Sequence, residues 1–377
     1  MIYLDAKLNK RIIPLLTIFL VALLVLVFFF AFDLTGNVIT NDKPIQVGAI
    51  LPLSGSMAYL GEEVRNALTL AEEDINSKNN KKIELIFEDS KMDPKEAISS
   101  ANKLILVNHV KYVYVFSTPI INAVKPITEQ NKVVLIGASL SSSILKDTNY
   151  TTRIHLNTDQ SIDLLIKFMK SKNMKNIAVL SQNSEVFSSQ LSKLSNEGID
   201  IIANEVFNQG DNDFRTQLIK IKEEKPEFLI ILGYGSHFPI LFKQLKELDM
   251  NNIRILGGMD FLDAPKDTLS LYDEAIFTVP TFNLYLNKQT KDFANEYKLR
   301  FNSKPTQQAA YAYDNLQILY EAITNTNGRA KEVTDYVKGM KNYKGVAGEI
   351  VLLPNGDSKG DISLATYDGG NLQEYKS

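Results

Sequence analysis

From residue 45 onward, short apolar runs alternate with longer segments in which apolar residues recur every three or four positions. The first run is 46–51 (QVGAIL), and the segment 62–77 that follows it has the period of an amphipathic helix. Further runs rich in Val and Ile lie at 83–87, 112–116 and 133–136. Alternation of this kind is typical of βα units around a mostly parallel sheet. We therefore predict an α/β module of four such units.

A second series of the same kind predicts a second α/β module in tandem. Its expected strands are 177–180, 199–206, 228–232 and 254–256, and its expected helices are 161–170, 188–196, 214–223 and 238–248. Beyond residue 276 the order changes, and three helices are expected at 289–301, 307–324 and 331–340. The chain then ends in a predicted hairpin that pairs 349–353 with 362–367, because Asn355-Gly356 is a strong turn signal.

The segment 12–32 carries no charge over 21 residues, which at about 1.5 Å per residue would cross roughly 30 Å of hydrocarbon. It is longer than the apolar part of a cleaved signal peptide, and no small-x-small site follows it. Basic residues precede it and acidic residues follow it, so we predict an uncleaved transmembrane signal anchor with residues 1–11 in the cytoplasm. Residues 33–44 then form a tether to an extracytoplasmic domain.

Composition excludes several classes of function. The net charge of -3 gives no basic excess for binding nucleic acid, and the absence of Cys excludes thiol nucleophiles and Cys-ligated metals. His109, His155 and His237 lie in different predicted units without the spacing of a helical metal site, and no phosphate-loop motif for ATP occurs. We therefore expect no metal and no cofactor.

One segment approaches a catalytic motif. Gly137-Ala138-Ser139-Leu140-Ser141 follows a predicted strand as the nucleophile of a G-x-S-x-G elbow would, but Ser141 replaces the last glycine. A hydrolase that uses Ser139 is therefore an alternative, and we predict that the chain is not an enzyme.

Several motifs resemble those of leucine/isoleucine/valine-type (branched-chain amino acid) solute-binding proteins of ABC transporters. They are spread over residues 45–367 and include 47–55 (VGAILPLSG), 72–76 (EEDIN), 210–214 (GDNDF), 256–258 (LGG) and 310–314 (AYAYD).

The resemblance implies a type I periplasmic binding protein, with two doubly wound parallel-sheet lobes that close on a small-molecule ligand, and a permease and an ATPase on separate chains. Three hinge crossings between the lobes are expected near 153–157, 278–282 and 342–346. The lobes are then expected to comprise 45–153 plus 280–343 for lobe 1 and 154–279 plus 344–377 for lobe 2. A sensory or regulatory receptor of the same fold is the alternative function.

Ligands of open α/β sheets bind beyond the carboxyl ends of the strands, where this sequence has short polar residues followed by helix starts. The resemblance assigns the carboxylate of an amino acid to the groups that follow two strands of lobe 1, and its ammonium to an acid of lobe 2, with a tyrosine on each side. The corresponding residues here are Ser117, Thr118, Ser139, Leu140, Ser141, Asp260, Tyr59 and Tyr234. The alternative for the serines is that they only cap helices.

Overall fold

The computed structural model describes residues 43–157, 159–263 and 273–376. The predicted anchor 12–32 and the predicted cytoplasmic segment 1–11 lie outside these ranges. None of the helices within the described ranges combines the length and the hydropathy that a membrane crossing needs. Residues from Ile45 onward form one compact unit.

A five-stranded parallel sheet organises the first half of this unit. Its strand order is β2-β1-β3-β4-β5, formed by β1 (Ile45–Leu51), β2 (Ile83–Asp89), β3 (Tyr112–Phe116), β4 (Val134–Ala138) and β5 (Thr151–Arg153). Successive residues of β1 point to opposite faces: Val47 and Ala49 belong to one buried cluster and Ile50 to another. The sheet is therefore covered by a core on each face.

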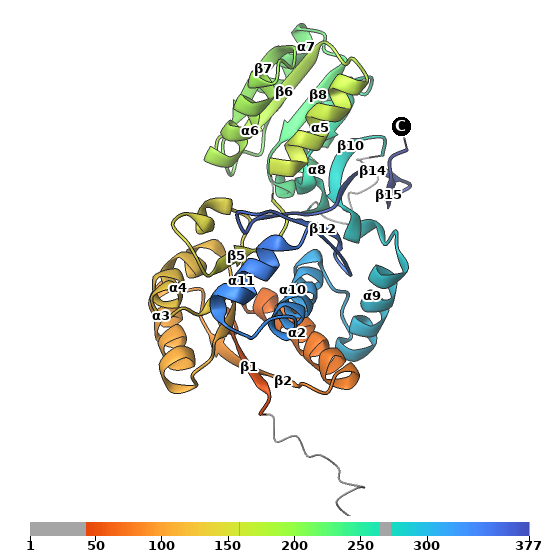
Figure 1. Ribbon diagram of the computed structural model, residues 1–377. Helices are drawn as coiled ribbons and strands as arrows, with labels where there is room; N and C mark the ends of the chain where they lie inside the picture. The colour runs from red at the N-terminus through yellow and green to blue at the C-terminus, as the bar shows by residue number, and fades with distance from the viewer. Residues whose placement is uncertain (1–42, 158, 264–272, 377) are drawn as a thin grey trace, which may run out of the picture. The chain divides into compact units, whose positions relative to one another are not determined.

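Helices from distant parts of the chain supply these two cores. One face packs against α2 (Ala58–Lys78), α9 (Lys288–Phe301), α10 (Gln307–Thr324) and α11 (Ala330–Gly339). In Figure 1, α2 and α10 lie side by side. The other face packs against α3 (Pro94–Asn102) and α4 (Thr118–Gln130). The helices predicted at 289–301 and 307–324 thus complete the first sheet, although some 140 residues separate them from it in the sequence.

The second sheet has seven strands in the order β15-β14-β10-β9-β8-β6-β7. Five are parallel: β6 (Ile177–Gln182), β7 (Ile201–Phe207), β8 (Phe228–Leu232), β9 (Arg254–Gly257) and β10 (Ile276–Pro280). An antiparallel edge follows, formed by β14 (Ile362–Asp368) and β15 (Asn371–Glu374). One face of this second sheet is covered by α5 (Asp159–Ser171) and α6 (Glu185–Asn196). The other face is covered by α7 (Arg215–Glu223) and α8 (Phe238–Glu247).

The chain passes between the sheets after β5, after β10 and before β14. The third passage differs from the expected crossing at 342–346. There the chain forms β11 (Asn342–Gly345), which pairs with β12 (Gly348–Leu352), and β12 buries Ile350 and Leu352 in the core of the first sheet. Residues 344–359 therefore pack with the first sheet, because alternate apolar residues of β12 need that core.

The predicted terminal hairpin is correct in its turn and wrong in its pairing. Gly356 has φ +87° in the turn after β12, which explains the glycine. The strand that returns is the two-residue β13 (Ser358–Lys359), whereas 362–367 lies in β14 and pairs with β10 and β15. The partner strand β10 lies some 80 residues earlier, so no local pattern could indicate that pairing, whereas β15 follows directly after Gly369-Gly370.

Candidate ligand cleft

The carboxyl ends of strands from both sheets surround one cavity of about 560 Å³. The first sheet contributes residues that follow β3 and β4, and the second contributes residues that follow β6, β8 and β9. Its lining includes Thr118, Leu140, Ser141, Glu185, Phe187, Tyr234, Met259, Asp260 and Gln308. This is the edge at which open α/β sheets bind their ligands.

Hydroxyl groups form the wall on the side of the first sheet. The Oγ of Ser139 lies 2.7 Å from Oγ1 of Thr118, donates to the carbonyl of Ser141 (2.9 Å) and accepts from its amide (3.0 Å). Ser139 is itself buried beneath the cavity lining, so its hydroxyl orients Thr118 and Ser141, which line it. None of its three partners is a general base, so the arrangement gives no support to a Ser139 nucleophile.

The serines behave in different ways at the helix starts. Ser141 caps the 3₁₀ turn Ser142–Leu145 by accepting from the amide of Ser143, as the capping alternative expects, and it also lines the cavity. Ser117 precedes α4 with φ +83°, makes no side-chain cap bond and does not line the cavity. Such a backbone is strained for a residue with a Cβ, and strain of this kind is often stored next to functional loops.

Aromatic and acidic side chains form the opposite wall. The ring of Tyr234 packs edge-on against the buried ring of Phe187, with 5.2 Å between centroids. Asp260 lies in the 3₁₀ turn Met259–Asp263 just beyond β9. Its Oδ2 is so close to Gly258 that a Cβ on this glycine would be only 3.2 Å away. A side chain at 258 would therefore disturb the carboxylate.

Among the sequence-predicted site residues, Thr118, Leu140, Ser141, Tyr234 and Asp260 come together at the cavity. Tyr59 does not: it lies in the first turn of α2 with 66% of its surface exposed. The helix was expected to begin at 62, but it begins at Ala58, so Tyr59 is carried on the helix rather than on a loop over the cleft.

Sequence reasoning missed Asp159, Glu185 and Gln308, which also line the cavity. Asp159 and Glu185 begin helices α5 and α6, where acids are common because they stabilise the helix dipole, so nothing marked them as site residues. Gln308 begins α10, far along the chain from the strand ends.

The charge of the lining is one-sided. Its described residues include the carboxylates of Asp159, Glu185 and Asp260 and no Lys, Arg or His. A cationic group is attracted to such a wall, whereas an anionic group is accommodated at the hydroxyls and helix-start amides of the first sheet.

Arg153 lies behind the hydroxyl wall and is fully buried. Its Nε donates to Oδ1 of Asp357 (2.5 Å), and its guanidinium also donates to the carbonyls of Ser139 (2.8 Å), Leu156 (3.1 Å) and Ser358 (2.8 Å). In addition, the amide of His155 donates to Oγ of Ser358 (3.0 Å). These bonds join the Ser139 loop to the first and third passages between the sheets.

Buried His155 connects the same passages to the cavity. Its ring stacks on Tyr311, and its two nitrogens lie 3.2 Å from the carbonyl of Leu156 and 3.0 Å from Oε1 of Gln308. Burial lowers the pKa of His155 to about 4, so the ring is neutral and can donate to only one of these oxygens. The Nε2–H tautomer donates to Oε1 of Gln308, and the Nδ1–H tautomer donates to the carbonyl of Leu156.

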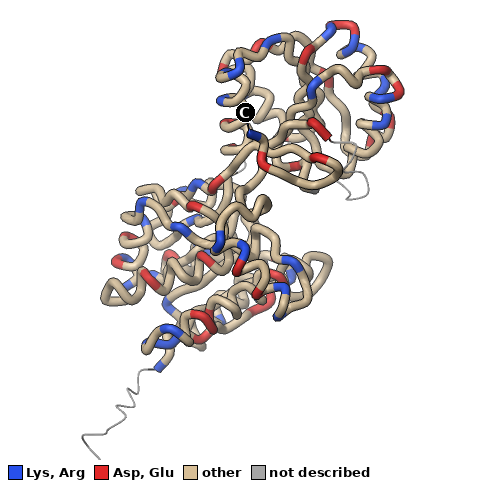
Figure 2. Tube along the Cα trace, turned by 90° about the vertical axis from the view of Figure 1, so that its right-hand side faces the viewer, with Lys and Arg blue, Asp and Glu red and all other residues tan. Residues whose placement is uncertain are grey.

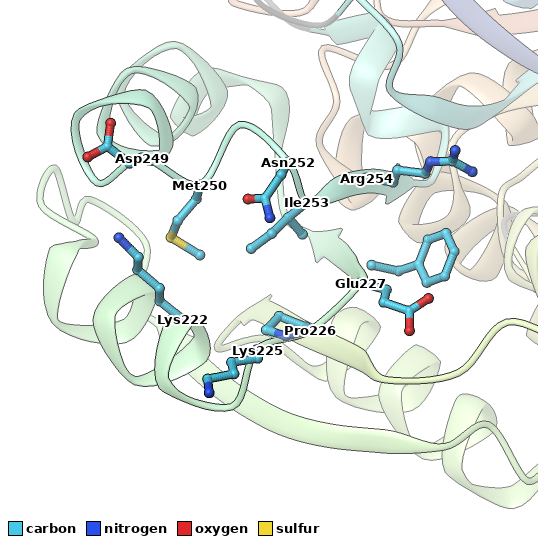
Figure 3. Close-up of a pocket in the computed structure, with 10 residues that line it drawn as sticks. Lys222, Lys225, Pro226, Glu227, Asp249, Met250, Asn252, Ile253 and Arg254 are labelled. Atoms are coloured by element: carbon cyan, nitrogen blue, oxygen red, sulfur yellow. The ribbon is translucent and has the colours of Figure 1, made fainter.

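A second cavity, of about 620 Å³, lies at the opposite ends of the strands of the second sheet (Figure 3). It surrounds Pro226 and Ile253, next to the amino ends of β8 and β9. Charges of both signs line it: Lys222, Lys225 and Arg254 with Glu227 and Asp249. Among the described elements, no helix begins toward it, so it lacks the amide donors of the carboxyl-end cavity.

Comparison with known proteins gives one family over most of the chain. The periplasmic binding protein family matches residues 44–371. The Leu/Ile/Val-binding protein BraC3 of Rhizobium johnstonii is 26% identical over 227 residues, which are 57% of this chain and 61% of that relative. The matched part thus spans less than two thirds of this relative.

Solved structures share the fold at low identity. The branched-chain amino acid transporter substrate binding protein LivJ of Streptococcus pneumoniae, in complex with isoleucine, has a TM-score of 0.69 at 21% identity, over 89% of this chain and 100% of that one. A solute binding protein of an ABC transporter from Rhodopseudomonas palustris BisB5, in complex with 3,4-dihydroxy benzoic acid, has a TM-score of 0.69 at 23% identity, over 88% and 96%.

Proposed function

Because the chain belongs to the periplasmic binding protein family, we propose that it is the extracytoplasmic solute-binding component of an ABC importer and that it binds a small amino acid between its two sheets. The observation that carries this proposal is the cavity lined by strand ends of both sheets, with hydroxyls on one side and carboxylates on the other. Family membership confirms the predicted resemblance and the prediction that the chain is not an enzyme.

The two walls suit the two charges of an amino acid. Its carboxylate accepts from amides at the helix starts and from the hydroxyls of Thr118 and Ser141, which turn away from Ser139 and Ser143 to donate to it. Its ammonium lies against Asp260. Three or four charge-assisted hydrogen bonds of about 1.5 to 3 kcal/mol each support the roughly 8 kcal/mol of micromolar binding after the costs of ordering. An aromatic acid would bring a negative charge without a compensating ammonium to a lining with three carboxylates.

Binding is coupled to closure in this proposal. The two sheets with their helices act as lobes, joined by the passages after β5, after β10 and before β14. A solute that contacts both lobes stabilises the closed arrangement by its differential affinity, and a permease with its ATPase on separate chains then recognises that arrangement. A sensory receptor of the same fold has no observation of its own in its favour.

The uncharged segment 12–32 supports a further part of the proposal. We infer that it anchors the chain in the cell membrane as a single transmembrane helix, with 1–11 in the cytoplasm and 33–44 as the tether. The solute-binding unit is then held outside the cytoplasm, beside its permease.

The test is calorimetry of the purified chain with leucine, isoleucine, valine, small carboxylates and 3,4-dihydroxybenzoate. We expect an aliphatic amino acid to bind, and Asp260→Asn to weaken it roughly 10- to 100-fold through loss of one charge-assisted bond. Asp249→Asn is the matched control, because Asp249 lines the cavity of Figure 3 instead. Binding of carboxylates alone, or unchanged affinity in Asp260→Asn, would refute the amino-acid assignment.

Ser139→Ala separates binding from hydrolysis. The variant loses the hydroxyl that orients Thr118 and Ser141, so we expect weaker binding of the same amino acid. Ester and amide substrates should show no turnover with either protein in a chromogenic assay. Turnover that disappears in Ser139→Ala would instead establish the hydrolase.

A further inference from the structure

A basic surface with exposed apolar residues lies at the amino ends of the first sheet, opposite the ligand cavity. We call it the amino-end patch and define it by Leu106, Val107, His109, Lys111, Lys132, Arg329 and Lys331. Most of these residues line a hollow of about 710 Å³. Lys111 directly precedes β3, and Lys132 lies two residues before β4.

The apolar part of the patch results from an irregular helix end. After α3 the helix ends in a π-helical turn, Lys103–Val107, closed by a bond from the amide of Asn108 to the carbonyl of Lys103 (3.0 Å). Leu104 is buried in the core, whereas Leu106 and Val107 are 57% and 69% exposed. Neighbouring large apolar residues on a surface often mark a contact with a partner or a membrane.

The charge of the patch is unusual for this chain, whose net charge is -3. The described residues that line the hollow include His109 and four Lys or Arg, but no Asp or Glu. Elsewhere Lys and Arg alternate with Asp and Glu along the chain (Figure 2), and the cavity of Figure 3 has both signs. Arg329 and Lys331 pair with Glu332 and Asp335, but these pairs are exposed and weak, and Lys111 and Lys132 are exposed.

The chain also enters the folded unit at this end of the sheet. β1 begins at Ile45, whose amide donates to the carbonyl of Lys82, and Gly48 of β1 is level with Val113 of β3. The apolar segment 12–32 ends only 12 residues earlier, a length that spans at most about 40 Å when extended. A bilayer that holds this segment is therefore within reach of the amino-end patch.

We propose that the amino-end patch lies on the surface of a membrane containing anionic lipid, with Leu106 and Val107 among the headgroups and the basic side chains on lipid phosphates. This inference rests on the membrane anchor included in the proposed function. Juxtamembrane basic groups bind anionic lipid, and apolar side chains next to them deepen the contact. The ligand cavity lies at the other ends of the strands, so it stays accessible to solute during this contact.

The absence of Trp from the chain allows a clean test in the full-length protein. Leu106→Trp is reconstituted into vesicles of phosphatidylcholine with phosphatidylglycerol, with and without brominated acyl chains. We expect the reporter to lose roughly half of its fluorescence to the brominated lipid, since interfacial side chains reach about 5 to 10 Å into the headgroup boundary. Leu299→Trp, at an 88% exposed position of α9, is the control and should be unquenched.

Charge variants identify the source of the attraction. Lys111→Glu with Lys132→Glu should abolish the quenching, as should pure phosphatidylcholine, while the protein still floats with the vesicles through its anchor. Lys222→Glu with Lys225→Glu, in the cavity of Figure 3, should leave it unchanged.

The outcomes separate the two proposals. Failure of the full-length chain to float with vesicles would refute the anchor. Flotation without quenching of the Leu106→Trp reporter would refute the lipid contact alone. The Trp fluorescence of Leu106→Trp could instead change with protein concentration in the absence of lipid. That result would assign the patch to contact with a second copy of the chain and overturn the inference.

Discussion

Arg153→Met is expected to lower the free energy of unfolding by about 3 to 5 kcal/mol, since removing one partner of a buried ion pair leaves the other charge uncompensated. Arg153 is fully buried, and Asp357 would lose its charged partner. Three carbonyls would also lose a donor. Methionine fills much of the volume, so the loss reports the polar bonds rather than a cavity.

Urea denaturation measures this change, and two variants make it interpretable. Arg215→Met removes an arginine that pairs with Asp213 and Glu247 at the surface, and it should change stability little. Arg153→Met with Asp357→Leu should recover part of the loss, because no unpaired charge then stays buried. Equal stability of Arg153→Met and Arg215→Met would show that the buried network contributes nothing.

Asp314→Asn and His155→Gln should shift the pH dependence of stability in opposite directions. Burial raises the pKa of Asp314 to about 7, against two bonds from the amides of Val346 and Ala347 that favour its charged form. Burial lowers the pKa of His155 to about 4. At about 1.4 kcal/mol per pKa unit, Asp314 is expected to contribute roughly 4 to 5 kcal/mol and His155 roughly 3 to 4 kcal/mol across their windows.

The signs of these contributions result from proton linkage. Folded Asp314 holds its proton more tightly than the unfolded chain does, so its contribution is complete below pH 3.8 and is lost as the pH rises to about 7. Folded His155 holds its proton less tightly, so its contribution is complete above pH 6.5 and is lost as the pH falls to about 4. Between pH 4 and 6.5 the two contributions offset each other in the native chain.

The two contributions are separated by denaturation at a series of pH values. The quantity compared is the free energy of unfolding of each variant minus that of the native chain. Asp314→Asn should lose stability relative to the native chain as the pH falls from 7 to 4, and His155→Gln should gain it from 6.5 to 4. The double variant should follow the pH profile of the native chain. A flat difference for either single variant would contradict the titration assigned to that residue.

Sequence patterns predicted the elements well where the determining contacts are local. The helix expected at 307–324 and the strand expected at 228–232 have the same bounds in the structure. The strand is a continuous apolar run that is buried throughout, and the helix is long enough for its apolar residues to show the helical period. The strand at 362–367 was also found, but its partners were not. β10 lies some 80 residues earlier, and the four-residue β15 (NLQE) has only one apolar residue to mark it.

The residues of the cavity divide in the same way. Thr118 and Asp260 could be placed at it because they lie just beyond strands, where topology brings chain ends together. Gln308 and Asp159 were missed because a residue that begins a helix has the same local signature whether or not the helix faces a cavity. Tyr59 was expected at the cavity but does not line it, because it lies on four residues of helix start that the apolar period did not reveal.

The guanidinium of Arg153 has a mechanical consequence. It bonds to Leu156 in the first passage and to Asp357 and Ser358, which lead into the third. These two segments are therefore held together. The passage after β10 is bonded to the third passage as well, because the amide of Thr281 donates to the carbonyl of Asp361 (3.0 Å). All three passages are thus cross-linked, so in the proposed closure they bend together as one hinge.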